Sequence, residues 1–468
     1  MSIKKLVKKL PYPIQQSMRY IYGAIPLRFR YGKVFWKTYN FLQESQWWSR
    51  EKLEEYQMQQ LNKLLHHAYE NVPYYRRIFH ERGLKPRHVQ SIDDLRKLPY
   101  LTKDDVRNNF GQLIARNIPK SRFKYVTTSG STGIPLWFYE ERSITTAREQ
   151  AFHQRMRDWI GYKLDDKCIV LRGNIIKRFE KGERAWWEYN PVDNLLTLSS
   201  YHMTEENLFK YIEKLNGFQP KFIQAYPSTV AVLAQFIKEH GMKPIPSIRA
   251  ILCGSENLYA SQRKMLEEVS RCRIFSWYGH TEKLVLAGEC EKDSRYHIFT
   301  EYGVTELVKN SGNPVESEGE MGEIIGTGFN NYVMPFIRYR TGDLAIYTQE
   351  KCSCGRHYPL IKNVEGRLQE YIVKRDNHLI PLGDMQIRNI FDNVKQFQFY
   401  QDKKGEVIFN IVKGDGYTSK DTEDIRRELY RRIGDDMILE IRFVDHIPRL
   451  TSGKYRFLIQ KLPIEFGY

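Results

Sequence analysis

The sequence contains no long apolar run. None of its hydrophobic stretches approaches the roughly 20 consecutive apolar residues that a transmembrane helix requires. The N-terminus also lacks the continuous apolar core of a secretory signal. We therefore expect a cytoplasmic protein with no segment that crosses a membrane.

Cysteine is scarce as well. The chain has 6 cysteines among 468 residues, scattered from Cys168 to Cys354. This number is too small, and the spacing too irregular, for a disulfide framework in a chain of this length. The few cysteines that lie close together are instead candidates for a metal site, considered below.

Three familiar signatures are missing. No Gly-Lys-Ser/Thr follows a glycine-rich loop at the spacing of a Walker P-loop, no Gly-x-Gly-x-x-Gly follows a predicted strand, and no His-Glu-x-x-His occurs. These absences argue against a P-loop nucleotide-binding protein, a dinucleotide-dependent redox enzyme and a zinc protease.

The chain does have enough apolar material for two cores. Hydrophobic residues make up 41% and aromatic residues 13% of the sequence, and the length exceeds the size at which one core stops growing. We predict an α/β protein with a large N-terminal domain over 1–369 and a small α+β C-terminal domain over 370–468. Residues 1–100 should form a helical, basic part of the large domain.

The hydrophobic pattern divides the large domain into two parts with different predicted secondary structure. Between 168 and 277, short apolar runs alternate with helix-period patterns, which predicts a doubly wound sheet with functional loops at its strand ends. From Gly322 onward, strand-like pieces separated by turn residues predict a β-rich subdomain. The expected strands are 124–128, 168–171, 221–225, 248–253, 274–277, 323–326, 336–339 and 344–347, and the expected helices are 205–215, 229–240 and 261–269.

The small domain is expected to begin near Gln369. Its pattern predicts a hairpin over 370–381, a helix over 384–394, a strand over 407–412, a helix over 419–433 and a strand over 439–444.

The charge is strongly positive. Lys and Arg number 73 against 56 Asp and Glu, which gives a formal net charge of +17 and would attract phosphates, nucleic acids or anionic lipid head groups. Residues 1–41 mix basic residues with Tyr, Phe, Ile and Leu, which predicts weak attachment to an anionic membrane surface; basic helices packed on the domain are the alternative. A basic nucleic-acid-binding protein is the main alternative to an enzyme, but no nucleic-acid partner is expected, because the basic residues are spread along the chain and match no recognised binding motif.

The most informative stretch is Thr127–Pro135, which is rich in hydroxyl residues and contains two glycines. Glycines let the backbone curl around an anion, and hydroxyls and backbone N–H groups can donate to phosphate oxygens. Taken alone, the stretch could equally be a polar hairpin turn.

Further motifs follow in a fixed order. They are Gly254-Ser255-Glu256, Tyr278-Gly279-His280-Thr281-Glu282, Tyr339-Arg340-Thr341-Gly342-Asp343, Gly366-Arg367, and Pro448-Arg449-Leu450-Thr451-Ser452-Gly453-Lys454. The set resembles the adenylate-forming enzymes, the superfamily of the acyl-CoA synthetases. The Cys-Ser-Cys-Gly-Arg at 352–356 and the basic, aromatic N-terminus are most similar to the phenylacetate-CoA ligase branch, and within it to the CapK-like proteins of polysaccharide biosynthesis.

The resemblance spans about 101–456 and implies ATP-dependent activation of a carboxylic acid as an acyl-adenylate. The 1–369 domain would then bind the nucleotide and the acid, and the 370–468 domain would be a mobile lid. Glu282 would bind Mg²⁺, and Thr281 would contact the α-phosphate. The residues that would hold the β- and γ-phosphates are Thr128, Ser129, Gly130, Ser131, Thr132 and Gly133.

The same resemblance places the nucleoside. Tyr278 and Gly279 would lie against the adenine, with Gly254, Ser255 and Glu256 lining the other side. Ser255 departs from the usual Gly-Gly-Glu and adds a side chain there. Two further residues complete the set: Asp343 would accept hydrogen bonds from the ribose hydroxyls, and Arg367 would reach the ribose or a phosphate.

Lys454 is the predicted catalytic residue of the first half-reaction. On a glycine-flanked loop of a mobile lid, its ammonium would stabilise charge only when the lid is closed; a lysine considered alone would be a solvated tail residue. The resemblance also implies that the lid rotates after adenylation and that Gly383 then lines the acceptor channel. Gln369 occupies the hinge position where an acidic residue is usual, which leaves the pivot open.

The second step has two alternatives. Coenzyme A as acceptor gives an acyl-CoA ligase, and an amine on a sugar or amino acid gives an amide-forming ligase. The acid is not identified by the sequence. Aromatic segments at 137–139, 186–189 and 226–228 are candidates for its pocket, although a packed core is the commoner use of such residues.

Two cysteine-containing segments predict a structural zinc site. The proposed ligands are Cys290, His297, Cys352 and Cys354, and three thiolates with one imidazole form an ordinary tetrahedral set with no open position. His357 is an alternative fourth ligand, and buried reduced cysteines without metal are the alternative interpretation.

Overall fold

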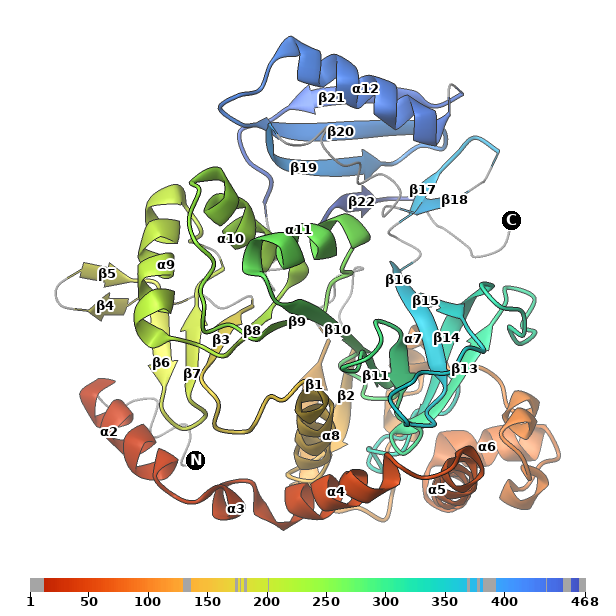
Figure 1. The fold of residues 1–468 in the computed structure, drawn as a ribbon. Helices are drawn as coiled ribbons and strands as arrows, with labels where there is room; N and C mark the ends of the chain where they lie inside the picture. The colour runs from red at the N-terminus through yellow and green to blue at the C-terminus, as the bar shows by residue number, and fades with distance from the viewer. Residues whose placement is uncertain are drawn as a thin grey trace.

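One twelve-stranded sheet runs through the larger part of the computed structural model (Figure 1). Its strand order is β13-β14-β15-β16-β12-β11-β10-β9-β8-β3-β7-β6. A smaller domain, formed by the C-terminal residues, lies above it in this view. The structure describes residues 12–128, 136–172, 176, 178–180, 183–200, 202–367, 371–376, 379–381, 393–434, 436–448 and 456–462.

One half of the sheet is doubly wound. Five neighbouring strands are parallel: β7 (Leu195–Leu198), β3 (Cys168–Leu171), β8 (Phe222–Ala225), β9 (Ala250–Gly254) and β10 (Arg273–Gly279). The helices that connect them are α9 (Glu205–Phe218), α10 (Pro227–Glu239) and α11 (Ala260–Ser270). Their apolar faces bury Leu215, Leu233 and Leu266 against Ile169 and Ile251 of the sheet. This half confirms the predicted doubly wound sheet.

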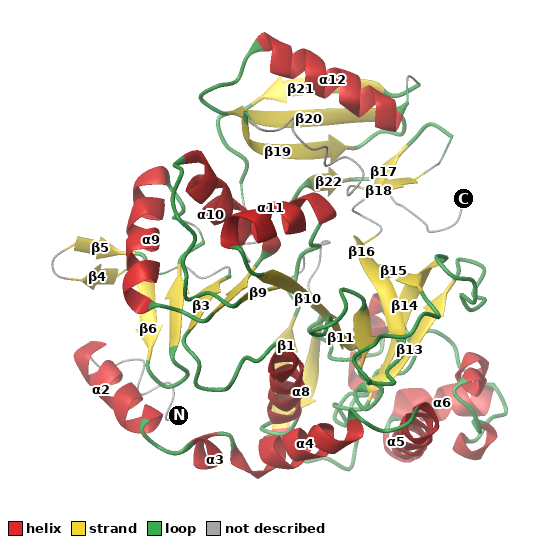
Figure 2. Cartoon of the chain, in the orientation of Figure 1, coloured by secondary structure: helices red, strands yellow, loops and turns green. Residues whose placement is uncertain are grey.

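Helix α8 (Thr145–Trp159) belongs to a separate core. Its Phe152, Met156 and Trp159 are buried with Leu286 and Tyr358 of the β-rich half. Helix α4 (Gly32–Ser45) packs against α8 (Figure 2). The sheet ends at β6 (Trp187–Asn190), which pairs antiparallel with β7 and was not predicted.

The other half of the sheet is antiparallel. It contains β11 (Leu286–Gly288), β12 (Tyr296–Ile298), β13 (Gly303–Val308), β14 (Met321–Gly328), β15 (Tyr339–Tyr347) and β16 (Leu360–Arg367). The predicted strand over 336–339 is wrong except at Tyr339, because Arg338 has a φ of 52° and breaks the extended backbone. Strand β15 instead carries the whole 339–343 motif. Gly342, at φ 74°, lies where the register with β14 shifts.

The N-terminal part is helical, as predicted. After α2 (Tyr12–Gly23) and α3 (Leu27–Arg30), helices α4, α5 (Arg50–Asn71) and α6 (Pro73–Glu81) run along the lower side in Figure 1, and α7 (Lys103–Asn108) follows them in the chain. The Ser49 side chain caps α5 by accepting from the Lys52 N–H. Among the described helices, none combines the length and apolar character needed to cross a bilayer.

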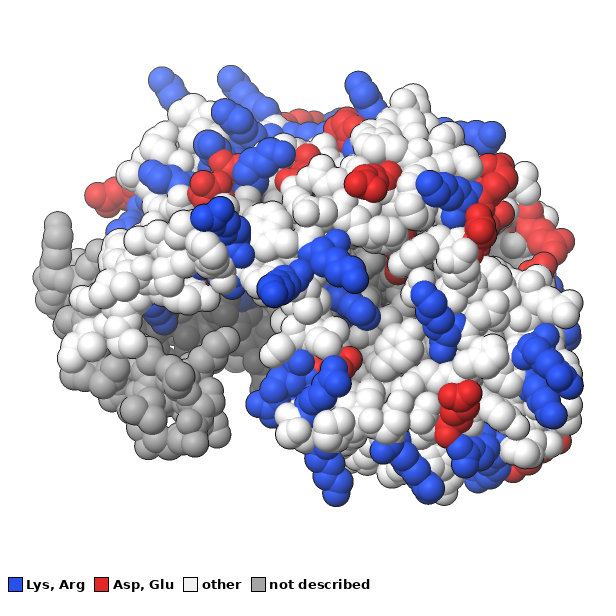
Figure 3. Space-filling view, turned by 90° about the horizontal axis from the view of Figure 1, so that it is seen from below, with Lys and Arg blue, Asp and Glu red and all other residues white. Residues whose placement is uncertain are grey.

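The first two helices leave large apolar side chains in contact with solvent. Tyr20, Ile21 and Phe29 are 57%, 71% and 64% exposed. By contrast, Phe35 and Leu42 of α4 are fully buried. Seen from below, Lys and Arg side chains are spread across the molecule with fewer acidic ones among them (Figure 3). Helix α4 therefore packs on the domain. Helices α2 and α3 also contact it, because Arg19 pairs with Glu188 and Arg30 donates to the Val192 carbonyl, but they leave Ile21 and Phe29 exposed. Attachment to a membrane surface stays a prediction.

The C-terminal residues form a separate core. A four-stranded sheet has the order β21 (Ile438–Phe443), β20 (Glu406–Lys413), β19 (Val394–Gln401) and β22 (Leu458–Gln460). Helix α12 (Ser419–Ile433) covers it with Ile425 and Leu429, and β17 (Tyr371–Val373) pairs with β18 (Leu379–Pro381). The predicted α+β class is confirmed. The helix expected over 384–394 is wrong at its end, because Val394 already begins β19; 384–392 and the boundary at Gln369 lie outside the described residues.

Two contacts join the C-terminal domain and its connecting strand to the same corner of the large sheet. Tyr259, at the start of α11, packs edge-on against Phe457 with ring centroids 6.0 Å apart. Asn257 Nδ2 donates to the Glu365 carbonyl of β16 at 2.9 Å. The C-terminal domain therefore lies next to the loop that follows β9.

Candidate active site

The parallel strands end at one edge of the sheet, where the predicted motifs begin. Gly254 is the last residue of β9, and Gly279 is the last of β10. A Cβ on Gly254 would lie 2.4 Å from Nε1 of Trp277, so only glycine fits there. Ser255 follows at φ 66° with an exposed side chain. Glu256 accepts a hydrogen bond from the Ser228 N–H at 3.0 Å, which ties this loop to the start of α10.

Tyr278 and Asp343 meet although they lie on β10 and β15. The Tyr278 hydroxyl donates to Oδ2 of Asp343 at 2.8 Å. Asp343 is held from behind as well, because its N–H donates to the Thr341 hydroxyl at 3.0 Å. The register with β14 shifts beside Gly342, while Asp343 itself stays paired with Arg367 of β16, and its carboxylate reaches Tyr278 of β10. The structure thus brings together the residues predicted to bind adenine and ribose.

A second contact between the same two motifs involves Glu282. Its Oε1 accepts from the Tyr339 hydroxyl at 3.0 Å, and the residue is 8% exposed. Carboxylate oxygens are the ligands that Mg²⁺ prefers, so Glu282 could hold this ion. Thr281, its neighbour, has an exposed side chain.

His280 lies between Tyr278 and Glu282 in the sequence, and the motif alone predicted no role for it. Its ring lies 6.0 Å from that of Tyr278 at an interplanar angle of 29°. Both ring nitrogens are buried, and neither has a hydrogen-bond partner within the described part of the chain. A buried imidazole without partners is unfavourable unless a ligand supplies one.

The predicted phosphate loop rises from a hairpin. Strands β1 (Phe123–Thr127) and β2 (Trp137–Glu141) pair antiparallel, and two hydrogen bonds close the base of the loop between Thr128 and Leu136 at 2.8 and 2.9 Å. The Thr128 hydroxyl accepts the second of these bonds. The five predicted residues Ser129, Gly130, Ser131, Thr132 and Gly133 lie outside the described residues.

An ion pair connects this hairpin to Glu282. Lys283, the next residue along the chain, contacts the Glu140 carboxylate of β2 through its ammonium. Glu140 is 1% exposed, and Lys124 is its second partner at 3.5 Å. Sequence reasoning missed this pair, because nothing in the spacing of 140 and 283 indicates that they meet. The pair fixes the base of the phosphate loop against the predicted Mg²⁺ ligand.

Arg172 is another residue that sequence reasoning missed. It directly follows β3, at the same edge of the sheet, and its Nε and Nη2 atoms are buried with no hydrogen-bond partner among the described residues. Burial, followed by the nearby charge of Arg157, lowers the pKa of the guanidinium. Its Cζ lies 5.8 Å from the centroid of the Trp277 ring. A polar residue directly after a buried parallel strand was the available signal.

Of three other predicted residues, the structure places only Arg367, and only by its backbone. Arg367 ends β16 and pairs with Asp343 in the ladder, so its backbone lies beside the predicted ribose ligand, although its side chain is not described. Gly383 and Lys454 lie outside the described residues. Their predicted roles in the acceptor channel and in adenylation stay predictions.

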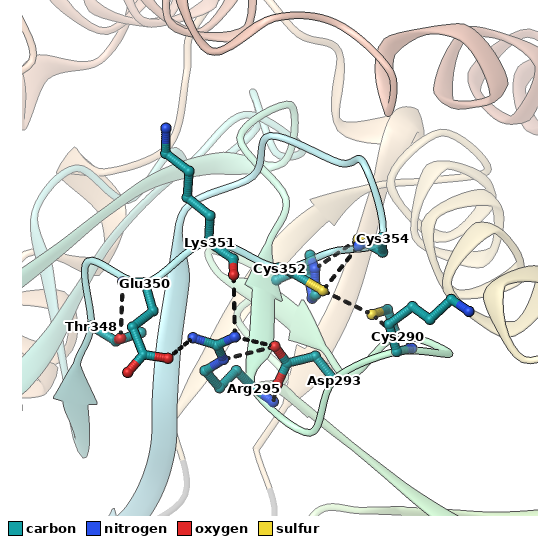
Figure 4. Close-up of polar contacts among 10 residues, drawn as sticks. Cys290, Asp293, Arg295, Thr348, Glu350, Lys351, Cys352 and Cys354 are labelled. Atoms are coloured by element: carbon teal, nitrogen blue, oxygen red, sulfur yellow. Dashed lines mark hydrogen bonds and ion pairs between the residues drawn. The ribbon is translucent and has the colours of Figure 1, made fainter.

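The four predicted zinc ligands converge at another place. The ligand atoms of Cys290, His297, Cys352 and Cys354 all lie within 4.8 Å of one another. Figure 4 shows the three cysteines of this group. His357, the alternative fourth ligand, is not in this group. Contact with Cys290, followed by the nearby His297, lowers the pKa of the Cys354 thiol, whereas contact with Cys354 and burial raise that of Cys290.

Sequence comparisons identify relatives over most of the chain. A family model described as the CapK C-terminal domain matches residues 374–461. Protein CapK of Staphylococcus aureus is 26% identical over 456 residues, covering 97% of this chain and 98% of that protein. A phenylacetate-coenzyme A ligase of Thermus thermophilus is 28% identical over 352 residues, covering 71% of this chain and 74% of that protein.

Solved structures share the fold. A 2-hydroxyisobutyryl-CoA ligase in the postadenylation state, in complex with 2-HIB-AMP, superposes with a TM-score of 0.69 at 17% identity, covering 89% of this chain and 93% of the other. The anthranilate CoA ligase AuaEII in complex with anthranoyl-AMP gives 0.52 at 13% identity, with coverages of 79% and 75%. The predicted α/β architecture with a small C-terminal domain is confirmed by these matches.

Proposed function

We propose that this chain, which belongs to the CapK and phenylacetate-CoA ligase branch of the adenylate-forming ligases, uses ATP to convert a carboxylic acid into an acyl-adenylate and pyrophosphate, and then transfers the acyl group. The observation that carries the proposal is the meeting of two distant motifs at one edge of the sheet. Tyr278 contacts Asp343, and Glu282 contacts Tyr339.

In the first step, a carboxylate oxygen of the acid forms a bond to the α-phosphorus, and the bond from that phosphorus to the pyrophosphate oxygen breaks. Negative charge must be neutralised on the acid and on the departing pyrophosphate. Mg²⁺, when bound at Glu282, would supply part of that neutralisation. The loop that rises from Thr128 would donate backbone and hydroxyl hydrogens to the phosphates.

Asp343 and Tyr278 bind the nucleoside in this proposal. A carboxylate accepts hydrogen bonds from two ribose hydroxyls well, and the Tyr278 hydroxyl holds it in place from the side of β10. Gly254 keeps the space beside Trp277 free of a side chain. The Tyr278 ring, which has the His280 ring 6.0 Å away, would lie against the adenine.

Arg172 binds the acid in this proposal. Its guanidinium lies at the strand-end edge, two of its buried nitrogens have no hydrogen-bond partner among the described residues, and the groups that act on its charge are Arg157, Tyr226, Cys253 and Cys168. A buried cation with no anionic partner is costly. An anionic group on the substrate would remove that cost, which makes Arg172 a candidate for orienting the carboxylate before attack.

Coenzyme A is the proposed acceptor. Attack by its thiol sulfur on the adenylate carbonyl forms the thioester, releases AMP and leaves the thiol proton to solvent or a base. The relatives named phenylacetate-coenzyme A ligase support this choice. Formation of an amide from a sugar or amino-acid amine is the alternative outcome, to be distinguished by supplying each acceptor with a presynthesised adenylate.

The N-terminal helices suit weak attachment to an anionic membrane surface. Exposed Tyr20, Ile21 and Phe29 offer apolar contact, and Arg28 lies over Phe29 at 4.6 Å from its centroid. Apolar side chains flanked by basic ones bind the interface of a bilayer that carries negative charge.

Pyrophosphate exchange tests the adenylation proposal. With an acid substrate present, the protein should return labelled pyrophosphate to ATP, and a panel of aryl, fatty, amino and sugar acids should identify the substrate class. Lys454→Ala should lose the exchange but still consume presynthesised acyl-adenylate, because the lysine is assigned only to the first step. No exchange with any acid, in protein that also fails to bind ATP, would refute the proposal.

A further inference from the structure

We propose that Cys290, His297, Cys352 and Cys354 hold one structural zinc ion that joins two loops of the β-rich half. Cys290 follows β11 and His297 lies on β12, whereas Cys352 and Cys354 belong to the loop between β15 and β16. About sixty residues separate the two pairs in sequence. This site is independent of the proposed ligase activity, since none of its residues belongs to the nucleotide site.

The distances fit a tetrahedral ion. The Sγ atoms of Cys290 and Cys352 are 3.6 Å apart, and Sγ of Cys354 lies 3.3 Å from Nε2 of His297. An ion with Zn–S bonds of about 2.3 Å and a Zn–N bond of about 2.0 Å holds two sulfurs about 3.8 Å apart and a sulfur and a nitrogen about 3.6 Å apart. A disulfide would require the two sulfurs to lie at about 2.05 Å.

Backbone hydrogen bonds favour thiolates at two of the cysteines. The Lys292 N–H donates to Sγ of Cys290 at 3.3 Å, and the Cys354 N–H donates to Sγ of Cys352 at 3.4 Å. In each loop a cysteine sulfur therefore accepts a hydrogen bond from the backbone, as a metal-bound thiolate does. Nε2 of His297 faces the sulfur of Cys354, so it is the nitrogen available for coordination.

A ring of polar contacts holds the two loops around the ligands. Arg295 contacts Asp293 of its own loop and reaches across to Glu350 and the Lys351 carbonyl (Figure 4). On the other side, Arg356 donates to the Glu291 carboxylate at 3.1 Å. Supporting contacts of this kind orient metal ligands and restrict their motion.

The ligand chemistry selects the ion and its role. Three thiolates and one imidazole suit a borderline-soft cation, and hard cations such as Mg²⁺ and Ca²⁺ prefer oxygen. Four protein ligands leave no open position for substrate or water, so the ion would be structural. Cys290 and His297 are both fully buried, at 0% exposed, beside the core that contains Trp159 and Tyr358.

Metal analysis of the full chain, purified without added metals or chelators, tests the proposal. About one zinc per chain is expected, falling below about a tenth in Cys352→Ser/Cys354→Ser. Cys272→Ser is the matched control, because this partly buried cysteine lies outside the cluster, and it should keep its zinc. Cobalt exchanged into the wild-type protein should show the visible bands of a tetrahedral thiolate complex.

Each other outcome overturns the proposal. Less than about a tenth of an equivalent of zinc in soluble, folded wild-type protein that also gives no cobalt spectrum would do so. A disulfide between Cys290 and Cys352, detected by mass spectrometry, or stoichiometric iron in place of zinc would do so as well. These measurements do not use catalytic activity. They can therefore overturn the zinc site while pyrophosphate exchange supports adenylation, and a failed exchange would leave the zinc site untouched.

Discussion

The hydroxyl of Tyr278 and Oδ2 of Asp343 lie 2.8 Å apart, although β11, β12 and β16 separate β10 from β15 in the order of the sheet. The sheet must therefore curve so that its two halves face each other across the strand ends. Because one hydrogen bond links the residues assigned to adenine and ribose, a change at either one should affect nucleotide binding.

Asp343→Asn should weaken ATP binding about 10- to 100-fold, because losing charged acceptor bonds to the ribose hydroxyls costs about 1.5–3 kcal/mol. Calorimetric titration with ATP would measure this. Tyr278→Phe, which removes only the supporting hydrogen bond, should cost about 1 kcal/mol and serves as the comparison. Unchanged ATP affinity in Asp343→Asn would remove Asp343 from the nucleotide site.

Lys283→Met should destabilise the fold by about 1–3 kcal/mol, because Glu140 would stay buried with Lys124 as its remaining ion-pair partner among the described residues. Denaturant unfolding would measure the loss. The double variant Glu140→Gln/Lys283→Met should recover most of it, since no uncompensated charge remains. A double variant less stable than Lys283→Met would show that the pair does not act as a unit.

Arg172→Met should raise the KM for the acid at least about 10-fold and that for ATP by less than about 3-fold, because a lost charged hydrogen bond costs about 1.5–3 kcal/mol. Its melting temperature should stay equal or rise, since the change removes a buried cation that has no partner for two of its nitrogens among the described residues. Initial rates at varied acid and ATP, with a thermal melt, would check both parts. A fall in melting temperature with an unchanged KM for the acid would assign Arg172 to folding alone.

Flotation with acidic liposomes at low salt should recover the wild-type protein with the vesicles. The double variant Ile21→Glu/Phe29→Glu should stay in the soluble fraction, because both side chains are exposed and their replacement opposes contact with anionic lipid. Ile438→Glu, at a 50% exposed position of β21, is the control and should float like wild type. Equal flotation of all three proteins would exclude the helices α2 and α3 as the attachment site.

The sequence predicted the wound half of the fold well because its signals are local. Periodicity placed α12 over 419–433 and positioned β8, α10 and β9 to within two residues. It failed where single backbone angles decide the structure. Arg338 at φ 52° breaks the expected 336–339 strand, and the 339–343 motif, with Gly342 at φ 74°, lies inside β15 instead of forming a turn. Side-chain patterns do not report such single-residue dihedral angles.

The sequence predicted those site residues that belong to recognisable motifs. Tyr278, Glu282 and Asp343 were named from their neighbours in sequence, and the four zinc ligands from Cys and His spacing. Arg172 and the Glu140–Lys283 pair were not, since their significance depends on burial and on partners far along the chain. Contacts of long sequence separation are the part of a site that one sequence leaves undetermined.

Strand β16 connects two features that have been treated apart. It begins six residues after Cys354, and its last residue, Arg367, stands two residues before the position expected to be the hinge. Through β16, the expected hinge of the C-terminal domain would thus be anchored to the proposed zinc site. Removal of the zinc ion should first increase the rate of amide hydrogen exchange along 360–367, before it affects the rate of adenylation.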